Sequence, residues 1–387
     1  MAKKLRVGIL FGGRSGEHEV SLRSAASILK AIDKKKYEVV PIGITKQGQW
    51  LTAGNAQALL VGELPVQEPV PAVAIIPPSP AIKPAKKAKG LALAAAAEPA
   101  SPALDVVFPV LHGTFGEDGT IQGLFELADI AYVGSGVLGS SAGMDKDAMK
   151  RMFAASQLPM TPHVTLLRSE WTADPKKATR LIEKKLQYPV FVKPANLGSS
   201  VGISKVKSRA DLAAAMDLAA SFDRKIVIEE GVGGPGVKPR ELEVAVLGND
   251  APDASVVGEI VPDREFYDYA SKYDATSTSE PVIPANITAK QAKQIREMAI
   301  AAFRACDCSG LARVDFLMEP THDAQGKKIR NPKIVLNEIN TMPGFTSISM
   351  YPKLWEASGI GYSQLIDRLI QFALERHAEK RETSFSK

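Results

Sequence analysis

Short apolar runs alternate with an amphipathic stretch in the first part of the chain. Residues 6–11 and 37–44 are rich in Val, Ile, Leu and aromatic side chains, as in strands that a parallel sheet buries on both faces. Between them, apolar positions from residue 20 to residue 32 recur at helical spacing, and residues 105–111 form a further buried run. The order strand, helix, strand predicts a βαβ unit within an N-terminal parallel sheet.

Strands and helices continue through the rest of the chain. We expect helices at residues 146–155, 175–186, 289–305 and 362–376, and strands at residues 188–193, 225–230, 241–247, 256–260 and 311–317 and around 335–336. The glycine-rich residues before Lys146 are expected to form a loop. These elements predict an α/β chain, α+β in part, with three domains at residues 1–138, 139–229 and 230–387.

Proline and alanine replace this pattern between about residues 62 and 103. The segment has no sustained periodicity and few large apolar side chains, so burial cannot offset the entropy of ordering it. We expect a flexible insertion in the first domain, parts of which could form a strand or a short helix. The sequence does not indicate its role.

Composition narrows the class of protein. The chain has 387 residues, of which 45% are hydrophobic and 24% charged, as in a soluble globular enzyme. The net charge of +5 comes without a Lys/Arg cluster interleaved with aromatics, so we expect no nucleic-acid partner. Cys306 and Cys308 have no metal-ligand residues nearby and are expected to be reduced thiols. No apolar stretch reaches membrane-spanning length and no signal peptide is evident, which favours the cytoplasm.

Oxygen ligands recur at alternate positions on two of the expected strands. Glu338 and Asn340 are two residues apart and so share one face of a strand, and Arg313 and Asp315 have the same spacing on an earlier strand. Carboxylate and amide oxygens from neighbouring strands suit a hard cation such as Mg²⁺, and an arginine beside them can stabilise developing negative charge. The alternative is an ordinary salt-bridge network on half-buried strands.

Three loops carry further candidate chemistry. Residues 343–347 (PGFTS) are rich in backbone N–H and hydroxyl donors, suited to a small carboxylate. Lys193 precedes a glycine- and serine-rich loop, residues 195–203, whose composition suits a phosphate clamp without the Walker A spacing. The first glycine turn, residues 12–17, lacks the G-x-G-x-x-G pattern of dinucleotide folds, and its Glu17 suits an ammonium group better than a phosphate.

Two further segments allow a functional and a structural interpretation. His112 ends a buried strand before a glycine-rich loop, at the strand end where α/β sheets bind ligands. It could equally be a hydrogen-bonded structural histidine. Residues 262–277 combine aromatic and charged side chains without a period, as in a lid over an active site or in an exposed aromatic loop.

Seven motifs in chain order resemble those of the D-alanine–D-alanine ligases, a family of ATP-grasp enzymes. They are GGRSGEHEVS, HGTFGEDGT, MDK, KPANLGSSVG, KIVIEE with RELEVAVLG, FYDYASKY, and RVD with NEIN and PGFTS. The resemblance covers almost the whole chain apart from the insertion. It is weaker at residues 231–239, which are longer and richer in Gly and Pro than the family usually shows.

The resemblance implies a three-domain ATP-grasp fold, ATP with two Mg²⁺ or Mn²⁺ ions, D-alanine as substrate, and a homodimer. It assigns residues to four groups. The catalytic group is Glu17, Ser199, Arg313, Tyr273 and His112, with Glu117 beside them; the nucleotide group is Lys146, Lys193, Ser200, Glu229 (at adenine), Glu241 (at the ribose) and Lys272; the metal ligands are Asp315, Glu338 and Asn340; the second substrate is bound at Gly344 and at a loop region with Ser349 and Met350.

The function implied is ATP-dependent ligation of two D-alanine molecules through an acyl phosphate, for peptidoglycan precursors. Two alternatives stay open. A D-alanine–D-lactate ligase would have the same fold and differ mainly at the lid residue, here Tyr273. A non-catalytic ATP-binding protein should lack a metal carboxylate or the arginine, and this chain has Arg313, Asp315 and Glu338.

Overall fold

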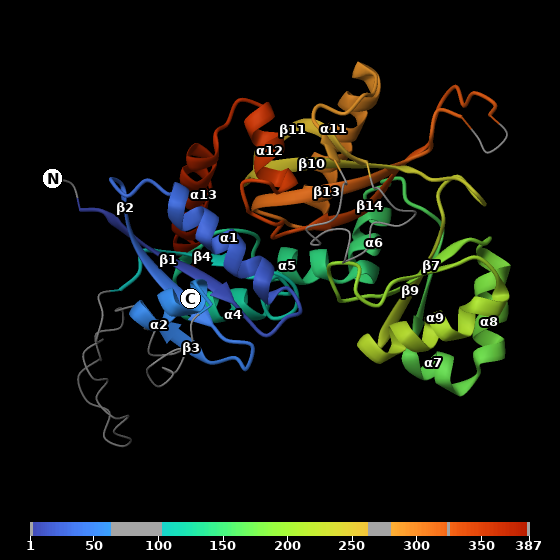
Figure 1. Ribbon diagram of the computed structural model, residues 1–387, viewed down its shortest axis with the longest axis horizontal. Coiled ribbons are helices and arrows are strands. Elements are labelled where there is room, and N and C mark those ends of the chain that lie inside the picture. The colour runs from blue at the N-terminus through green and yellow to red at the C-terminus, as the bar shows by residue number, and fades with distance from the viewer. Residues whose placement is uncertain (1–2, 63–102, 262–279, 323–325, 385–387) are drawn as a thin grey trace.

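The computed structural model describes residues 3–62, 103–261, 280–322 and 326–384 (Figure 1). The expected insertion therefore lies outside the described residues almost entirely, and the expected lid with Lys272 and Tyr273 lies outside them completely. The described residues form three sheets, each with its own helices.

The first sheet has the order β3-β2-β1-β4-β5 and confirms the predicted βαβ unit. Its strands are β1 (Leu5–Gly12), β2 (Tyr37–Ile44), β4 (Val106–Val110) and β5 (Ala131–Tyr132), which pair in parallel, and β3 (Trp50–Thr52), which pairs antiparallel at one edge. The helices are α1 (His18–Ala31), α2 (Ala53–Leu60) and α4 (Thr120–Leu127). Ile9 and Phe108 are fully buried, as expected for strands covered on both faces.

The second sheet is antiparallel, with the order β12-β11-β10-β13-β14. Its strands are β10 (Arg240–Gly248), β11 (Asp253–Val261), β12 (Glu280–Val282), β13 (Gly310–Met318) and β14 (Ile334–Asn340). Two helices pack on this sheet through one apolar core: α11 (Ala289–Ala305), and α6 (Lys146–Ala155), which precedes the sheet in sequence. The helix α12 (Met350–Ala357) covers β10 and β11 from the other side.

A smaller antiparallel sheet, β6-β9-β7-β8, forms the green lobe at the lower right of Figure 1. Its elements are β6 (His163–Leu167), β7 (Val190–Pro194), β8 (Ser204–Val206), β9 (Lys225–Glu230), α7 (Arg168–Ala173), α8 (Pro175–Lys185) and α9 (Arg209–Phe222). The lobe has a separate apolar core. The loop between β7 and β8, which carries the expected phosphate clamp, extends from this lobe.

The last helix, α13 (Tyr362–Arg381), returns to the first sheet. Its buried residues Leu365 and Leu369 belong to the same core as Ile9 and Phe108, and Figure 1 shows α13 beside α1 and β4. The beginning and the end of the chain therefore share one core, which holds the first and second sheets together.

Two expectations about local structure were wrong. The stretch expected as a loop before Lys146 contains the helix α5 (Val137–Met144), so the boundary predicted after residue 138 falls inside a helix. A Cβ at Gly139 would lie 2.4 Å from the backbone oxygen of Asp307, so this helix needs a glycine where it packs. The region of Ser349 and Met350 was expected as loop, whereas Met350 begins α12.

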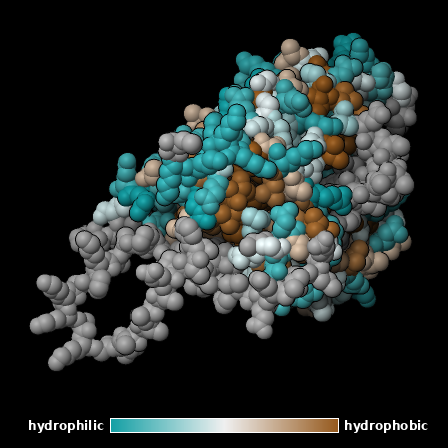
Figure 2. Space-filling view, turned by 60° about the vertical axis from the view of Figure 1, so that its left-hand side comes forward, coloured by the Kyte–Doolittle hydropathy of each residue, from teal (hydrophilic) through white to brown (hydrophobic). Residues whose placement is uncertain are grey.

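The surface is mainly hydrophilic on the face in Figure 2, with hydrophobic residues gathered near its centre. Within the described ranges, none of the helices combines the length and the apolar character needed to span a membrane.

Candidate active site

Two cavities meet between the three sheets. The larger, of about 880 Å³, is lined by the predicted residues Glu17, His112, Glu117, Lys146, Ser199, Asn340, Gly344, Ser349 and Met350. The smaller, of about 220 Å³, is lined by Lys193, Glu229, Glu241 and Asp315. Both are lined by Ser200, Arg313 and Glu338, so the cavities adjoin there. The structure thus brings together every predicted site residue that it describes.

The paired strands β13 and β14 place the expected oxygen ligands opposite one another. Asp315 pairs with Glu338, and Arg313 pairs with Asn340. Arg313 donates two hydrogen bonds of 2.7 Å to Asp315 and lies 3.2 Å from Glu243. Burial disfavours the Arg313 charge, but Asp315 and Glu243 outweigh it and raise the pKa of Arg313 well above its ordinary value. The salt-bridge network that was the alternative to a metal site does form, between Arg313, Asp315 and Glu243. It lies in the wall of the cavity.

These residues fit a divalent cation. Asp315, Glu338 and Asn340 supply hard oxygen donors on one side of the cavity, as Mg²⁺ and Mn²⁺ prefer. In the described part of the chain no group of three or more His, Cys, Asp or Glu side chains could hold a metal. The set therefore has two carboxylates and depends on the Asn340 amide for its third donor.

Glu17 lies at the entrance to α1 and links two sheets. The hydroxyl of Ser199, from the loop between β7 and β8, donates a hydrogen bond to its carboxylate. A Cβ at Gly198 would lie 2.9 Å from Glu17 Oε2. The loop can therefore lie this close to the Glu17 carboxylate because residue 198 is a glycine. Ser199 and Ser200 have φ of +51° and +60°, a left-handed backbone uncommon for residues other than glycine and often found at functional sites.

His112 holds the end of β4 to two other segments. Its Nδ1 donates to the carbonyl of Met342 at 2.9 Å, since a carbonyl can only accept. Its Nε2 lies 3.1 Å from the Ser24 hydroxyl, which must then be the donor. Burial lowers the pKa of His112, in keeping with a neutral ring. Both nitrogens are thus engaged, which favours an orienting role for His112.

Glu117 is buried close to Glu17. Its carboxyl accepts a hydrogen bond of 2.7 Å from the Gly113 backbone N–H. Burial, and then the charge of Glu17, raise the pKa of Glu117 to about 8. This carboxyl therefore keeps its proton at neutral pH, unlike an ordinary glutamate.

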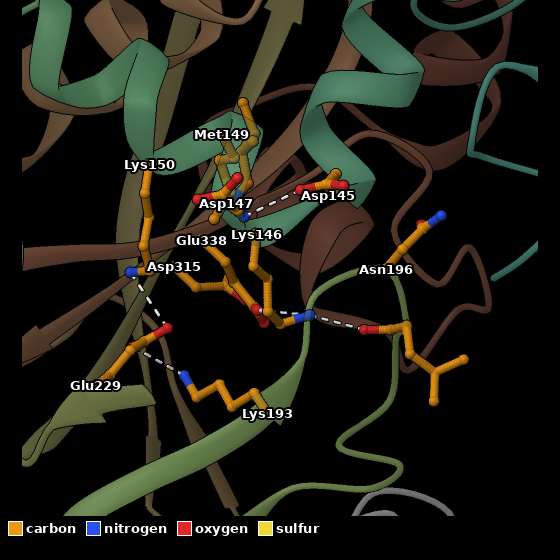
Figure 3. Close-up of polar contacts among 12 residues, drawn as sticks. Asp145, Lys146, Asp147, Met149, Lys150, Lys193, Asn196, Glu229, Asp315 and Glu338 are labelled. Carbon is orange, nitrogen blue, oxygen red and sulfur yellow. Dashed lines mark hydrogen bonds and ion pairs between the residues drawn. The ribbon is translucent and has the colours of Figure 1, made fainter. Parts of the chain in front are cut away.

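Two lysines from α6 point into the site (Figure 3). The N-cap residue Asp145 accepts hydrogen bonds from the first turn of α6 and fixes where the helix begins. Lys146 donates to the Leu197 carbonyl at 2.7 Å and lies 4.0 Å from Glu338. Lys150, one turn later, lies 3.3 Å from Glu229. Sequence reasoning missed Lys150, although its i,i+4 spacing from Lys146 puts both on one helix face.

Glu229 also accepts a hydrogen bond of 3.0 Å from Lys193. Burial alone would raise the pKa of Glu229, but Lys150 and Lys193 lower it to about 2. Glu229 therefore stays ionised between two lysines. Its expected contact with adenine stays a prediction, as does that of Glu241 with ribose.

The walls of the smaller cavity combine apolar and polar groups. Phe191, Val232 and Leu242 provide apolar surface beside Glu241, and residues 234–239 of the unusually long segment after β9 lie along it. The apolar part of this wall suits a flat heterocycle.

The segment before α12 completes the larger cavity. The backbone N–H of Phe345 donates to Ser24, and that of Thr346 donates to Ser349. Ser349 and Met350 line the cavity at the start of α12, so the positive end of this helix faces it. The site expected in a loop is therefore a helix N-terminus, which also suits a carboxylate.

The chain matches two family models, described as D-ala D-ala ligase N-terminus (residues 6–135) and D-ala D-ala ligase C-terminus (residues 152–371). It is 47% identical to a D-alanine–D-alanine ligase of Geobacillus thermodenitrificans over 99% of both chains. It is 46% identical to D-alanine–D-alanine ligase A of Escherichia coli over 97% of both.

Solved structures agree with this. The D-alanine–D-alanine ligase of Coxiella burnetii has a TM-score of 0.75 at 34% identity, covering 98% of this chain and 97% of that one. A D-Ala:D-Ser ligase of Enterococcus faecalis has a TM-score of 0.75 at 35% identity, covering 96% of this chain and 100% of that one. The chain belongs to the D-alanine–D-alanine ligase family and has its ATP-grasp fold.

Proposed function

We propose that the protein joins two molecules of D-alanine into D-alanyl-D-alanine and converts one ATP to ADP and phosphate. One observation carries the proposal: residues from three sheets, among them Glu17, Ser199 and Arg313, line adjoining cavities in a chain of this family. The product would serve peptidoglycan synthesis, and the use of ATP favours the cytoplasm.

The first D-alanine would place its ammonium on Glu17. Its carboxylate oxygen would then attack the γ-phosphorus of ATP, forming an acyl phosphate and releasing ADP. A free carboxylate is a poor electrophile, and the phosphoryl group turns one of its oxygens into a leaving group. Lys146, Lys193 and Ser200 line the two adjoining cavities where the phosphates would lie, and their donors would neutralise the charge of the triphosphate.

The second D-alanine would bind through its carboxylate to Arg313 and the start of α12. Its amine, after losing a proton, would attack the acyl carbon, and the tetrahedral intermediate would expel phosphate to leave the amide. The Arg313 guanidinium and the Gly344 backbone N–H both line this cavity and would stabilise the oxyanion. Because an acyl phosphate reacts with water, the reaction benefits from an enclosed cavity.

Asp315, Glu338 and Asn340 would hold Mg²⁺ or Mn²⁺. When bound, the metal would offset negative charge on the transferred phosphoryl group. We also propose a homodimer for the active protein, on the family resemblance alone.

The second substrate separates D-alanine ligation from its alternatives. One solved relative is named as a D-Ala:D-Ser ligase, and a D-alanine–D-lactate ligase was the alternative from sequence. D-alanine is favoured because the curated relatives at 46% to 49% identity are named D-alanine–D-alanine ligases. The non-catalytic alternative gains no support, since Arg313, Asp315 and Glu338 are all present and line the site.

Phosphate release from ATP tests this function. D-alanine, L-alanine, D-serine and D-lactate are supplied singly and in pairs with D-alanine. We expect rapid release with D-alanine alone, D-alanyl-D-alanine as product, and little release with L-alanine. Faster release with D-alanine plus D-lactate or D-serine than with D-alanine alone would reassign the second substrate. No release with any of them would overturn the enzymatic proposal.

A further inference from the structure

Lys150 is fully buried next to Glu229, which lines the smaller cavity, and the reaction proposed above gives Lys150 no role. Its side chain leaves the middle of α6 with 0% exposure. Its ammonium lies 3.3 Å from Glu229 Oε1, while Lys193 donates to Glu229 Oε2 at 3.0 Å. Figure 3 shows the Glu229 carboxylate between the ammonium groups of the two lysines.

Burying a lysine is costly, so its location needs a physical reason. Glu229 is itself only 4% exposed. Paired with Lys193 alone, Glu229 would cancel the charge of that lysine, and the pair would offer nothing to an anion. With Lys150 on its other oxygen, the cluster has two cations and one anion. One positive charge is then left over.

This surplus charge is not taken up by another neighbour with hydrogen-bonding geometry. Across the described ranges, Lys150 Nζ has no hydrogen-bond acceptor of good geometry beyond the ion pair with Glu229. Burial and the charge of Lys193 lower the pKa of Lys150 below its ordinary value, while the adjacent Glu229 carboxylate and, more weakly, Glu338 favour the charged form. Lys193, in contrast, lines the smaller cavity next to Ser200. The extra positive charge of the cluster is therefore accessible to an anion in the smaller cavity, through the Lys193 ammonium.

We propose that Lys150 is a positioning residue for the nucleotide phosphates: by sharing Glu229, it leaves the Lys193 ammonium oriented but not neutralised. This inference rests on the proposed use of ATP. It differs from a packing role, in which Lys150 would only join α6 to β9. A packing role predicts a loss of stability with Lys150→Met whatever residue stands at 229. The proposed role predicts a loss of phosphate binding that depends on the Glu229 carboxylate.

The test is a cycle of four proteins: wild type, Lys150→Met, Glu229→Gln, and the double variant. Each is titrated with ADP and Mg²⁺ by calorimetry, with its melting temperature recorded. We expect Lys150→Met to weaken ADP binding by about tenfold or more while Glu229 is present, and by no more than about threefold in the Glu229→Gln background. The two proteins that carry Glu229→Gln both lack the carboxylate, so a contact between that carboxylate and adenine cannot contribute to the difference between them.

Two further variants separate charge from packing. Arg151→Met removes one positive charge from the next position of α6, where the side chain is 75% exposed, and should leave ADP binding unchanged. Lys150→Arg keeps the charge and should bind ADP better than Lys150→Met. In steady-state assays, Lys150→Met should raise KM for ATP while KM for D-alanine stays within about twofold.

Equal losses in both backgrounds, or wild-type binding by Lys150→Met, would overturn the proposal. If Lys150→Met does not fold, the comparison of Glu229→Gln with the double variant decides. A difference of more than about threefold between their ADP affinities contradicts the proposal. Failure of the proposed function would look different. Wild type would then not bind ADP, or would bind it normally and not ligate D-alanine.

Discussion

The hydroxyl of Ser199 donates a hydrogen bond to the carboxylate of Glu17, although the two residues lie 182 positions apart in the chain. One belongs to the loop between β7 and β8 and the other to the turn before α1. The contact joins the small lobe to the first sheet across the larger cavity. It also leaves the second Glu17 oxygen to be used by a substrate ammonium in the proposed reaction.

Ser199→Ala should therefore reduce the use of the first D-alanine. Losing a partly buried hydrogen bond costs about 1–3 kcal/mol, because the carboxylate is left short of a donor. We expect kcat/KM for D-alanine to fall by about 10- to 100-fold, with a smaller change in ADP affinity. Ser221→Ala is the matched control, since its exposed hydroxyl donates to a local carbonyl of α9, that of Leu218. Equal activities of the two variants would show that the contact is incidental.

The sequence predicted the strands and the placement of their oxygen-bearing side chains on neighbouring strands well, because these signals are local. Asp315 and Glu338 stand at alternating positions of buried strands, and the structure pairs them directly. The bounds of β2, β9 and α11 agree to the residue. Here burial follows periodicity, and periodicity can be read from a few consecutive residues.

Other features were missed because they depend on distant parts of the chain. The helix α5 has the sequence VLGSSAGM, whose glycines predict a loop, and its close packing outweighs that propensity. Lys150 resembles a solvated helix lysine until β9 brings Glu229 to it, 79 positions later in the numbering. The residues around a lysine do not show that it is buried, because only the fold determines which face of α6 is inside.

Arg313 should be needed for stability as well as for turnover. It stands between the carboxylates of Asp315 and Glu243, and Arg313→Met would remove this cation from both buried carboxylates. Breaking a buried pair in this way costs about 3–5 kcal/mol. We expect chemical denaturation to show this loss for Arg313→Met, together with an inactive protein.

Arg313→Lys distinguishes charge from geometry. It keeps the positive charge but cannot donate two parallel hydrogen bonds to Asp315. We expect stability closer to wild type and a loss of turnover of about 10²-fold. Arg151→Lys, at a 75% exposed side chain in an ion pair with Asp147, serves as control and should change neither. Full activity of Arg313→Lys would contradict the proposed role at the oxyanion.

Glu338→Gln should nearly abolish turnover while the fold stays intact. The change removes one of the two carboxylates opposite each other on β13 and β14, and a loss of about 10²-fold or more is expected for such a charge. Mn²⁺ binding in the presence of ADP, followed by electron paramagnetic resonance, should weaken in parallel. Glu319→Gln, just beyond β13, is the control. Near-normal turnover at saturating Mg²⁺ would refute the metal assignment.

The proton on Glu117 should make stability fall as pH rises. In the folded protein the pKa of Glu117 is raised from its ordinary 4.5 to about 8. Between these values the folded state holds a proton that the unfolded chain has released, so each added pH unit favours the unfolded state, by at most about 1.4 kcal/mol. Below pH 4.5 both states hold the proton, and above pH 8 neither does, so the effect is confined to this window.

Glu117→Gln cannot titrate and keeps an oxygen that can accept the Gly113 N–H. Its melting temperature relative to wild type should therefore increase steadily from pH 5 to pH 8, because wild type loses stability there and the variant does not. Thermal unfolding at each pH unit measures the difference. Glu297→Gln, 67% exposed on α11, should stay parallel to wild type throughout. If Glu117→Gln is also parallel to wild type, Glu117 does not hold a proton in the folded protein that the unfolded chain releases, and the raised pKa is refuted.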